Sequence, residues 1–359
     1  MPTLRTRLIA GSAALAAGLA GVAVLAPAGP ASATRVEAAC SDAAGDAATI
    51  QAAIDSSKEG DEIVIKGPCL IDATISLADR RTYRGDAKAG TVGLLLRSWN
   101  TRVYDLDIYG TPSDGIRISN PSRNGTTLRN TMVNSVISDV YIEGAAEAGI
   151  RVVDPGDSVT DWTLQRSWIG FSGTHAIQSD NAAGWTMSGL HLYATPKNAI
   201  DAHRCFGTSI EDNYIEDFGA ESTAGQTYYG IRCDLQGDAA TTITGNRVHK
   251  FLPPPNALAE LRKARQSGSA PPERKFAATG PLPDGVDFVY MALDAVNYAA
   301  GHAAITGNTV VGHGTKRETG ILLAKGEGES MSVASSGNLL DGVGVRRKVG
   351  AGVRLTRGY

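Results

Sequence analysis

The sequence has few aromatic residues, few cysteines and little excess charge. Aromatic residues make up 6% of the 359 positions, only four residues are cysteine, and the formal net charge is −3 at pH 7. Nucleic acid is not expected as a partner, because binding it needs a concentrated positive surface. His203 and Cys205 are the one close pair at ligand spacing that involves a cysteine, and a single pair does not make a zinc site.

A long apolar run occurs only at the start of the chain. Arg5 and Arg7 precede an apolar stretch at residues 8–25, and Ala31-Ser32-Ala33 follows it. This order is typical of a secretory signal peptide, so we expect residues 1–33 to be removed and the mature protein to be secreted and extracellular. No later stretch approaches the length of a membrane span, and a membrane is not expected as a partner.

The cysteines form two pairs of similar separation, Cys40 with Cys69 and Cys205 with Cys233. An even number of cysteines in an exported protein favours disulfides. We expect these two bonds, while Cys233 also fits a small buried apolar residue.

Residues 46–66 predict a helix followed by a strand. Asp46 is a capping residue before apolar positions four apart in 47–55, and 62–66 is a short run rich in branched apolar residues. Such a helix suits a cap over the open end of a solenoid, which repeat folds need. We therefore expect a cap and first coils at 34–102 and a repetitive region at 103–359.

Two strand patterns alternate in the repetitive region. The first begins with Gly or Ala and a branched apolar residue, as in Gly149–Val152 and Ala199–Ala202, and we extend it to Ala292–Ala295 and Gly352–Leu355. The second joins two apolar positions across a polar centre, as in 210–215. Irregular spacing, short strands and few helical patterns predict an all-β parallel β-helix rather than a sandwich or propeller.

Asparagines recur at one place in the second pattern, at Asn213, Asn246, Asn308 and Asn338. In stacked coils about 4.8 Å apart, such amides bond to one another and to the turn backbone. One interval between coils is double, and its proline-rich residues 252–286 predict an insertion on the rim. This insertion is either a flexible tether or a wall beside a groove.

Residues 49–55 and 60–65, with the repeats that follow, resemble the entry segment and coils of the right-handed parallel β-helix, pectate-lyase-like proteins. The resemblance implies that fold for most of the chain. It does not choose a function, because the scaffold carries lyases, hydrolases, epimerases, phage depolymerases and non-catalytic surface proteins.

Outward positions of the first pattern gather ionisable residues in three consecutive coils. The predicted catalytic residues are Asp180, Asp201, His203 and Asp234, and the predicted substrate-binding residues are Arg151, Gln178, Arg204, Tyr229, Arg232 and Asp294. We expect His203 to lie between Asp180 and Asp234, where two carboxylates would make it hold its proton more firmly. A solvated ladder of ion pairs is the alternative interpretation.

Residues 199–203 also resemble the strand that carries Asp-Pro-His in mannuronan epimerases. The resemblance implies catalytic roles for Asp201 and His203 in moving a sugar-ring proton. Ala202 stands where that family has proline, and Asn198 stands where it has a catalytic tyrosine; Tyr229 in the next coil is a candidate replacement.

The sequence therefore predicts a secreted carbohydrate-active enzyme with a polysaccharide substrate, a lyase or epimerase acting on uronic-acid sugars. One alternative is a glycoside hydrolase or glycosyl transferase that uses paired aspartates, and another is a non-catalytic carbohydrate-binding protein. Calcium held by the aspartates is a further hypothesis. Trp162, Trp168 and Trp185 fit either sugar stacking or core packing.

Overall fold

The computed structural model describes residues 34–41, 43–67, 69, 73, 75–85, 94–97, 99–111, 113–120, 131–154, 156–250, 282–295 and 300–357. These residues belong to one compact unit, Ala33–Tyr359. The predicted signal peptide at 1–33 and most of the predicted insertion, its residues 252–281, lie outside the described residues. No helix in the described ranges is long and apolar enough to cross a membrane.

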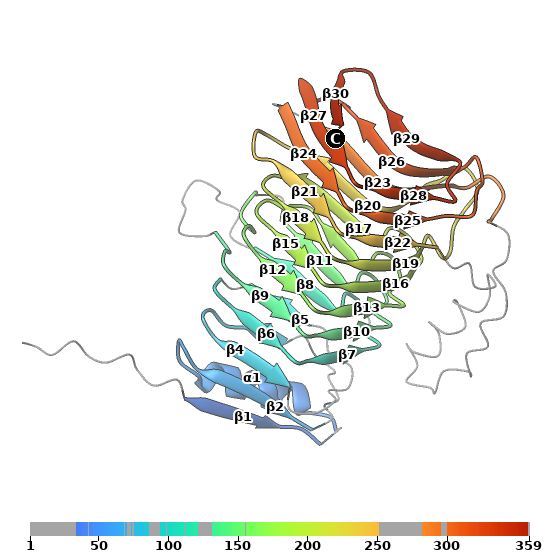
Figure 1. Ribbon diagram of the computed structural model, residues 1–359. Coiled ribbons are helices and arrows are strands. Elements are labelled where there is room, and N and C mark those ends of the chain that lie inside the picture. The colour runs from blue at the N-terminus through green and yellow to red at the C-terminus, as the bar shows by residue number, and fades with distance from the viewer. Residues whose placement is uncertain are drawn as a thin grey trace, which may run out of the picture. The chain divides into compact units, whose positions relative to one another are not determined.

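The described strands form three parallel sheets whose members stack coil upon coil (Figure 1). Sheet A contains β1 (Arg35–Ala39), β2 (Glu62–Lys66), β4 (Thr82–Gly85), β6 (Arg102–Tyr104), β9 (Val136–Ser138), β12 (Thr163–Gln165), β15 (Thr186–Ser188), β18 (Ser209–Glu211), β21 (Thr241–Thr244), β24 (Ala300–Thr306), β27 (Ser330–Ser336) and β30 (Val353–Arg357). Sheet B contains β3 (Ile75–Leu77), β5 (Leu94–Leu96), β8 (Ile116–Ser119), β11 (Ile150–Val153), β14 (Ile177–Ser179), β17 (Ile200–Cys205), β20 (Thr227–Leu235), β23 (Asp287–Ala295), β26 (Glu318–Ala324) and β29 (Val345–Val349). Sheet C contains β7 (Asp107–Tyr109), β10 (Tyr141–Glu143), β13 (Trp168–Gly170), β16 (His191–Thr195), β19 (Tyr214–Phe218), β22 (Arg247–His249), β25 (Thr309–Val311) and β28 (Leu339–Asp341). The predicted all-β, right-handed parallel β-helix is confirmed.

The core lies between the sheets and is built by side chains that alternate inward along each strand. Branched residues of the first pattern pair in register along sheet B and are fully buried, as Ile177, Ile200 and Ile231 show. The first pattern therefore defines sheet B. Gly352–Leu355 is an exception, because β30 pairs with β27 in sheet A.

A second exception concerns the coil of β23. Ile231 pairs with Met291, so Ala292 lies beside Arg232 and Asp294 lies beside Asp234. The predicted start of this coil at Ala292 was wrong by two residues. A shift of two residues keeps the same side chains inward, so the alternation of the sequence did not reveal it.

The second pattern forms the corner between sheets A and C. Asn213, between β18 and β19, donates a 2.9 Å hydrogen bond to Asn246 Oδ1. Asn246 donates to Asn308 and Asn308 to Asn338 at the same distance. The predicted asparagine ladder is confirmed, and it satisfies backbone groups at four successive corners.

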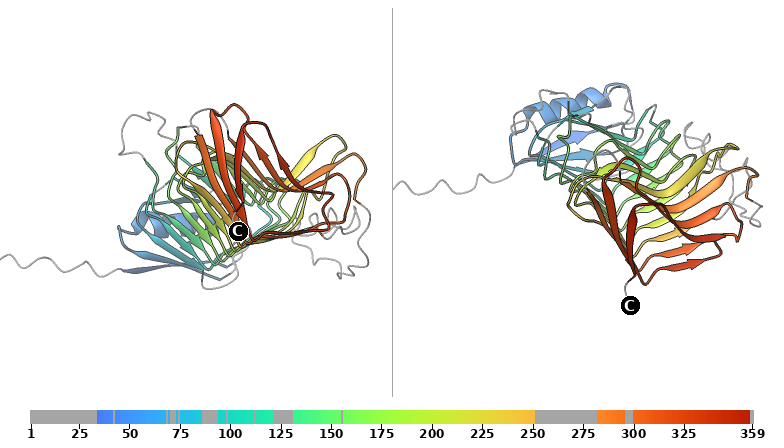
Figure 2. Two further views of the ribbon diagram at one scale, coloured as in Figure 1. Left: turned by 45° about the horizontal axis from the view of Figure 1, so that its top comes forward. Right: turned by 90° about the horizontal axis from the view of Figure 1, so that it is seen from above.

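The predicted helix is α1 (Asp46–Ser56), and it packs against β1, β2 and β3 at the start of the sheets (Figure 2). Asp46 does not cap it. The N-cap is Gly45, and the Asp46 carboxylate instead accepts hydrogen bonds from the backbone of Ser41 and Ala43. Both predicted disulfides are present, Cys40–Cys69 and Cys205–Cys233.

Candidate active site

The outward face of sheet B carries a column of polar residues from successive strands. Gln178 on β14 pairs with Asp201 on β17, and Asp201 pairs with Arg232 on β20. Arg151 on β11 lies beside Gln178 in the same column. The expected alignment of these four positions is therefore present.

A β-bulge re-aims the end of β17. Ala202 pairs with Cys233 and Cys205 with Leu235, so β17 has one more residue than β20 between these pairs. Arg204, inside the bulge, has a φ of 54°, in the left-handed region. Bulges of this kind redirect side chains and are frequent beside active sites. The disulfide Cys205–Cys233 fastens the bulged strand to its neighbour.

His203, in the bulge, contacts carboxylates on two strands. Its Nδ1 donates a 2.7 Å hydrogen bond to Asp234 Oδ2, and its Nε2 lies 3.9 Å from Asp201 Oδ1. The hydrogen bond to Asp234 raises the pKa of His203 above 6.5, with the charge of Asp201 also favouring the protonated ring and burial opposing it. The imidazole side chain is 36% exposed, so it combines a fixed orientation with access to solvent.

Arg232 lies against the same two carboxylates. Its guanidinium donates a 3.1 Å hydrogen bond to Asp234 Oδ2 and lies 3.6 Å from Asp201 Oδ1. Asp201 and Asp234 are buried, whereas Arg232 is 35% exposed. One oxygen of each buried carboxylate has no hydrogen-bond partner within the described part of the chain. Polar atoms without partners are costly in a protein interior and are frequent at functional sites.

Tyr229 completes this side of the cluster. The Arg232 guanidinium lies 5.9 Å from the centre of the Tyr229 ring. Burial raises the pKa of the phenol above 10, Arg232 opposes this rise, and the charges of Asp201 and Asp234 add to it. Tyr229 therefore keeps its proton near neutral pH. Asn198 accepts a hydrogen bond from the Tyr229 backbone, which holds the start of this coil.

His175 was not among the predicted site residues. It precedes β14, and its Nε2 lies 3.9 Å from Asp201 Oδ2, on the other oxygen from His203. Its side chain is only 9% exposed, and burial lowers its pKa below 6.5 although Asp201 opposes this effect. Asp201 thus lies between one histidine whose pKa is raised and one whose pKa is lowered.

The structure does not bring all the predicted site residues together. None of the ion pairs that His203 makes in the described ranges involves Asp180, because the pairing of β14 with β17 ends at Ser179. Arg204 turns to Asp157 and to the backbone carbonyl of Asp154. Asp294 lies beside Asp234 in the next coil and its charge adds to the raised pKa of Tyr229, while its carboxylate accepts a 2.7 Å hydrogen bond from the backbone of Gly326.

Arg151 pairs with Glu147 at 3.2 Å. The connected cluster is therefore narrower than the predicted set, and its members are Asp201, His203, Tyr229, Arg232, Asp234 and His175.

The hypothesis of calcium held by the aspartates stays a prediction. Asp201 and Asp234 face the cations of Arg232 and His203, which already compensate their charge. Among the described residues, no group of three or more His, Cys, Asp or Glu side chains is arranged to hold a metal ion.

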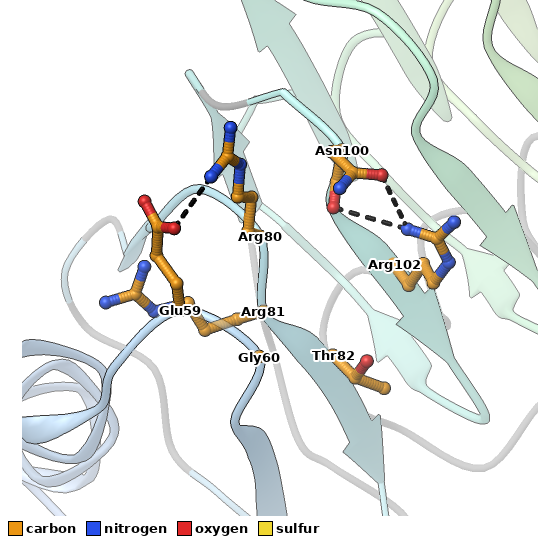
Figure 3. A pocket seen from close by; sticks show the side chains of 7 residues that line it. All are labelled: Glu59, Gly60, Arg80, Arg81, Thr82, Asn100 and Arg102. Carbon is orange, nitrogen blue, oxygen red and sulfur yellow. Dashed lines mark hydrogen bonds and ion pairs between the residues drawn. The ribbon is translucent and has the colours of Figure 1, made fainter. Parts of the chain in front are cut away.

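A cationic pocket of about 410 Å³ lies near the N-terminal cap (Figure 3). Arg80 pairs with Glu59 at 2.7 Å, and Arg102 donates a 2.9 Å hydrogen bond to Asn100. Arg81 donates to the side chain and backbone oxygens of Ser57, at the end of α1. These guanidinium groups bind protein oxygens, and we interpret their role as stabilisation of the N-terminal cap.

Comparison with solved structures supports the fold. An alginate lyase from Paenibacillus sp. str. FPU-7 superposes with a TM-score of 0.58 at 14% identity, covering 89% of this chain and 99% of the lyase. The enzymatically active domain of the bacteriophage CBA120 tailspike protein 2 gives a TM-score of 0.53 at 12% identity, covering 90% of this chain. This chain spans 46% of that tailspike chain.

The A-module of a mannuronan C-5 epimerase from Azotobacter vinelandii gives a TM-score of 0.45 at 14% identity, covering 88% of this chain and 96% of the module. No family model and no curated protein sequence matches the chain. The class defined by the two structures with TM-scores of 0.58 and 0.53 is the parallel β-helix fold, since identities this low establish fold alone.

Proposed function

We propose that the protein acts on uronic-acid polysaccharides by removing the proton at C5 of the sugar ring, as a lyase or an epimerase. The observation that carries this proposal is the cluster of His203, Asp234, Arg232 and Asp201, in which a half-exposed imidazole is oriented by a buried carboxylate beside a half-exposed guanidinium. Exposed groups of this kind on a rigid sheet are suited to substrate contact.

In this proposal His203 is the general base. Asp234 holds the Nδ1 proton, so the neutral ring presents Nε2 as the acceptor. Because Asp234 raises the pKa of His203, the ring is a stronger base than a free histidine. Asp201 lies on the Nε2 side and favours the imidazolium that forms when the proton arrives.

Arg232 meets the carboxylate of the uronate. The negative charge that develops on this carboxylate when C5 loses its proton is stabilised by the positive charge of the guanidinium, which stays paired with Asp234 and Asp201. Arg232 supplies the positive charge that a bound calcium would otherwise provide.

Tyr229 is the proton donor. In elimination, the electron pair left at C5 forms the double bond to C4, the C4–O bond breaks and the phenol protonates the departing oxygen. In epimerisation, the phenol returns a proton to the opposite face of C5. The raised pKa of Tyr229 keeps this proton available at the pH where His203 is neutral.

Two further observations support the proposal. The solved structure with a TM-score of 0.58 over nearly its whole length is an alginate lyase, and the two disulfides fit the oxidising compartments where extracellular polysaccharides occur. A hydrolase that pairs Asp180 with Asp201 or Asp234 has less support, because Asp180 is not connected to the cluster and Asp201 and Asp234 are compensated by cations.

The test is incubation of the full chain with mannuronan, guluronan, polygalacturonan and glucuronan. Product formation is followed by ultraviolet absorbance of the unsaturated uronate and by NMR of the sugar composition. We expect unsaturated or epimerised product from one of these polymers and none from the His203→Ala variant. Reducing ends without either product would instead indicate a hydrolase, and tight binding without product would indicate a carbohydrate-binding protein.

A further inference from the structure

Sheet C carries a row of aromatic side chains on its outward face. Tyr141 on β10, Trp168 on β13, His191 on β16 and Tyr214 on β19 pair in register. We call these four residues the aromatic strip. Neighbouring ring centres are 6.3, 4.3 and 4.8 Å apart along the strip. With coils about 4.8 Å apart, the strip extends for about 14 Å along the solenoid.

A second row of rings flanks the strip. Tyr193 packs edge to face with Trp168, and its hydroxyl lies 2.9 Å from that of Tyr141. Gly170 makes room for it, because a Cβ at this position would lie 2.3 Å from the Tyr193 ring. The coil of β13 therefore has no side chain at the position that the Tyr193 ring occupies.

Cross-strand ring contacts stabilise sheets by themselves, and this is the structural role to weigh first. Trp168 is more exposed than such a structural role requires. It is 49% exposed, whereas Trp162 and Trp185 are buried in the core. Trp168 is contiguous with the rings of Tyr141 and His191, and contiguous exposed apolar surface marks an interaction site.

A shallow pocket of about 420 Å³ lies over the strip, lined by Trp168, Tyr141, Val140, Arg166 and Asp139. Arg166 donates hydrogen bonds of 2.9 and 2.7 Å to Asp139. The pocket therefore combines aromatic walls with a neutral pair of hydrogen-bonding groups.

We propose that the aromatic strip binds a neutral pyranose polysaccharide that lies along the solenoid. Sugar rings have apolar C–H faces, which pack on aromatic rings, and a rim of hydroxyls, which the Arg166–Asp139 pair and the His191–Glu216 contact at 3.2 Å match. Three carboxylates border the strip, those of Asp139, Glu143 and Glu216, together with the two guanidinium groups of Arg166 and Arg247. Because these groups carry no net positive charge, a neutral polysaccharide is favoured over an acidic one.

The strip belongs to sheet C, and the His203 cluster belongs to sheet B. Binding at the strip thus goes beyond the proposed reaction. It attaches the protein to a neutral glycan while the sheet B face stays available for substrate.

The test is electrophoresis of the full chain through gels that contain hydroxyethyl cellulose, mixed-linkage β-glucan or galactomannan. We expect retardation by at least one of these neutral polymers and about tenfold weaker retention for Trp168→Ala, as for a central aromatic contact. The matched control is Trp99→Ala. Trp99 is also exposed, but it packs under Arg80 near the N-terminal cap, and its removal should leave retention unchanged.

Three outcomes would overturn the proposal: no retardation by any neutral polymer, equal retention of Trp168→Ala and the parent chain, or retention abolished by Arg232→Ala. Sedimentation at the same concentrations adds a fourth, since self-association lost in Trp168→Ala would make a second copy of the chain the occupant of the strip.

Discussion

His203 and Asp234 come from adjacent coils of sheet B and are joined by a 2.7 Å hydrogen bond from Nδ1 to Oδ2. The register that pairs Ala202 with Cys233 brings the next residues, His203 and Asp234, together at the start of the bulge in β17. The hydrogen bond fixes the tautomer of His203 and raises the pKa of the ring, so the acid–base behaviour of the site depends on one contact.

Asp234→Asn should move the pH dependence of turnover. In the proposed mechanism the neutral His203 is the base, so the rate of turnover by the parent chain should rise as the pH increases through the raised pKa of His203. Without the carboxylate this pKa falls, the rising limb shifts to lower pH, and the maximal rate drops about a hundredfold. NMR titration of His203 measures the same shift directly. An unchanged His203 titration in Asp234→Asn would contradict this account of the contact.

The two histidines should change the pH dependence of folding stability in opposite directions. His203 has a raised folded-state pKa, so its stabilisation is complete below pH 6.5 and is lost as the pH rises through that folded-state value. His175 has a lowered folded-state pKa, so the native state loses stability as the pH falls from 6.5 towards that value. Thermal melts of His175→Gln should show less loss of stability in acid than the parent chain. A greater loss of stability in acid for His175→Gln than for the parent chain would contradict the lowered pKa of His175.

The asparagine ladder should be most sensitive at its centre. Asn246 is fully buried, accepts hydrogen bonds from the backbone and amide of Asn213, and donates to Asn308. Asn246→Ala should lower the free energy of unfolding by about 3 kcal/mol, because buried donors lose their partners. Asn338→Ala, at the end of the ladder, is the matched control and should cost less. Equal shifts in urea midpoint for the two variants would argue against a cooperative ladder.

The two disulfides should differ in their effect on activity. They close loops of similar length, with sequence separations of 29 and 28 residues. Loss of either should therefore cost about 3.5 kcal/mol of stability. Only Cys205–Cys233 joins the strands that carry the site, so its replacement by a pair of alanines should also reduce kcat, whereas replacement of Cys40–Cys69 should not. Equal kcat values for the two double variants would contradict a specific role of the Cys205–Cys233 disulfide in activity.

Chelation should leave turnover unchanged if, as proposed, the Arg232 guanidinium beside Asp201 and Asp234 takes the place of a metal ion at the substrate carboxylate. The measurement compares initial rates with and without EDTA, and then with added calcium. A reversible loss of activity with EDTA would place calcium in the mechanism and remove the role given to Arg232.

The fold and half of the site could be predicted from alternation alone. Gly or Ala before a branched residue fixed the register from Arg151 to Arg232, and this register placed Asp201 and Arg232 side by side. It also brought His203 to Asp234. Alternation does not record a shift by two residues, which is why Asp294 was assigned to the wrong row.

The remaining differences arise where strands end. Asp180 lies just beyond the last residue of β14 that pairs with β17, so its predicted contact with His203 did not form. His175 lies before the first residue of β14, where alternation gives no direction. The sequence nevertheless contains a signal for His175. It directly precedes the Gly-or-Ala position of its coil, as Tyr229 precedes Gly230 in the coil of β20.

Exchange at C5 in heavy water is the most direct test of the proposed chemistry. The control is His302→Ala, because His302 lies on β24 of sheet A, outside both the His203 cluster and the aromatic strip. With the responsive uronan in D2O, we expect deuterium at C5 or unsaturated product with the parent chain and with His302→Ala, and neither with His203→Ala. Exchange that persists in His203→Ala would contradict the central claim that this imidazole removes the proton.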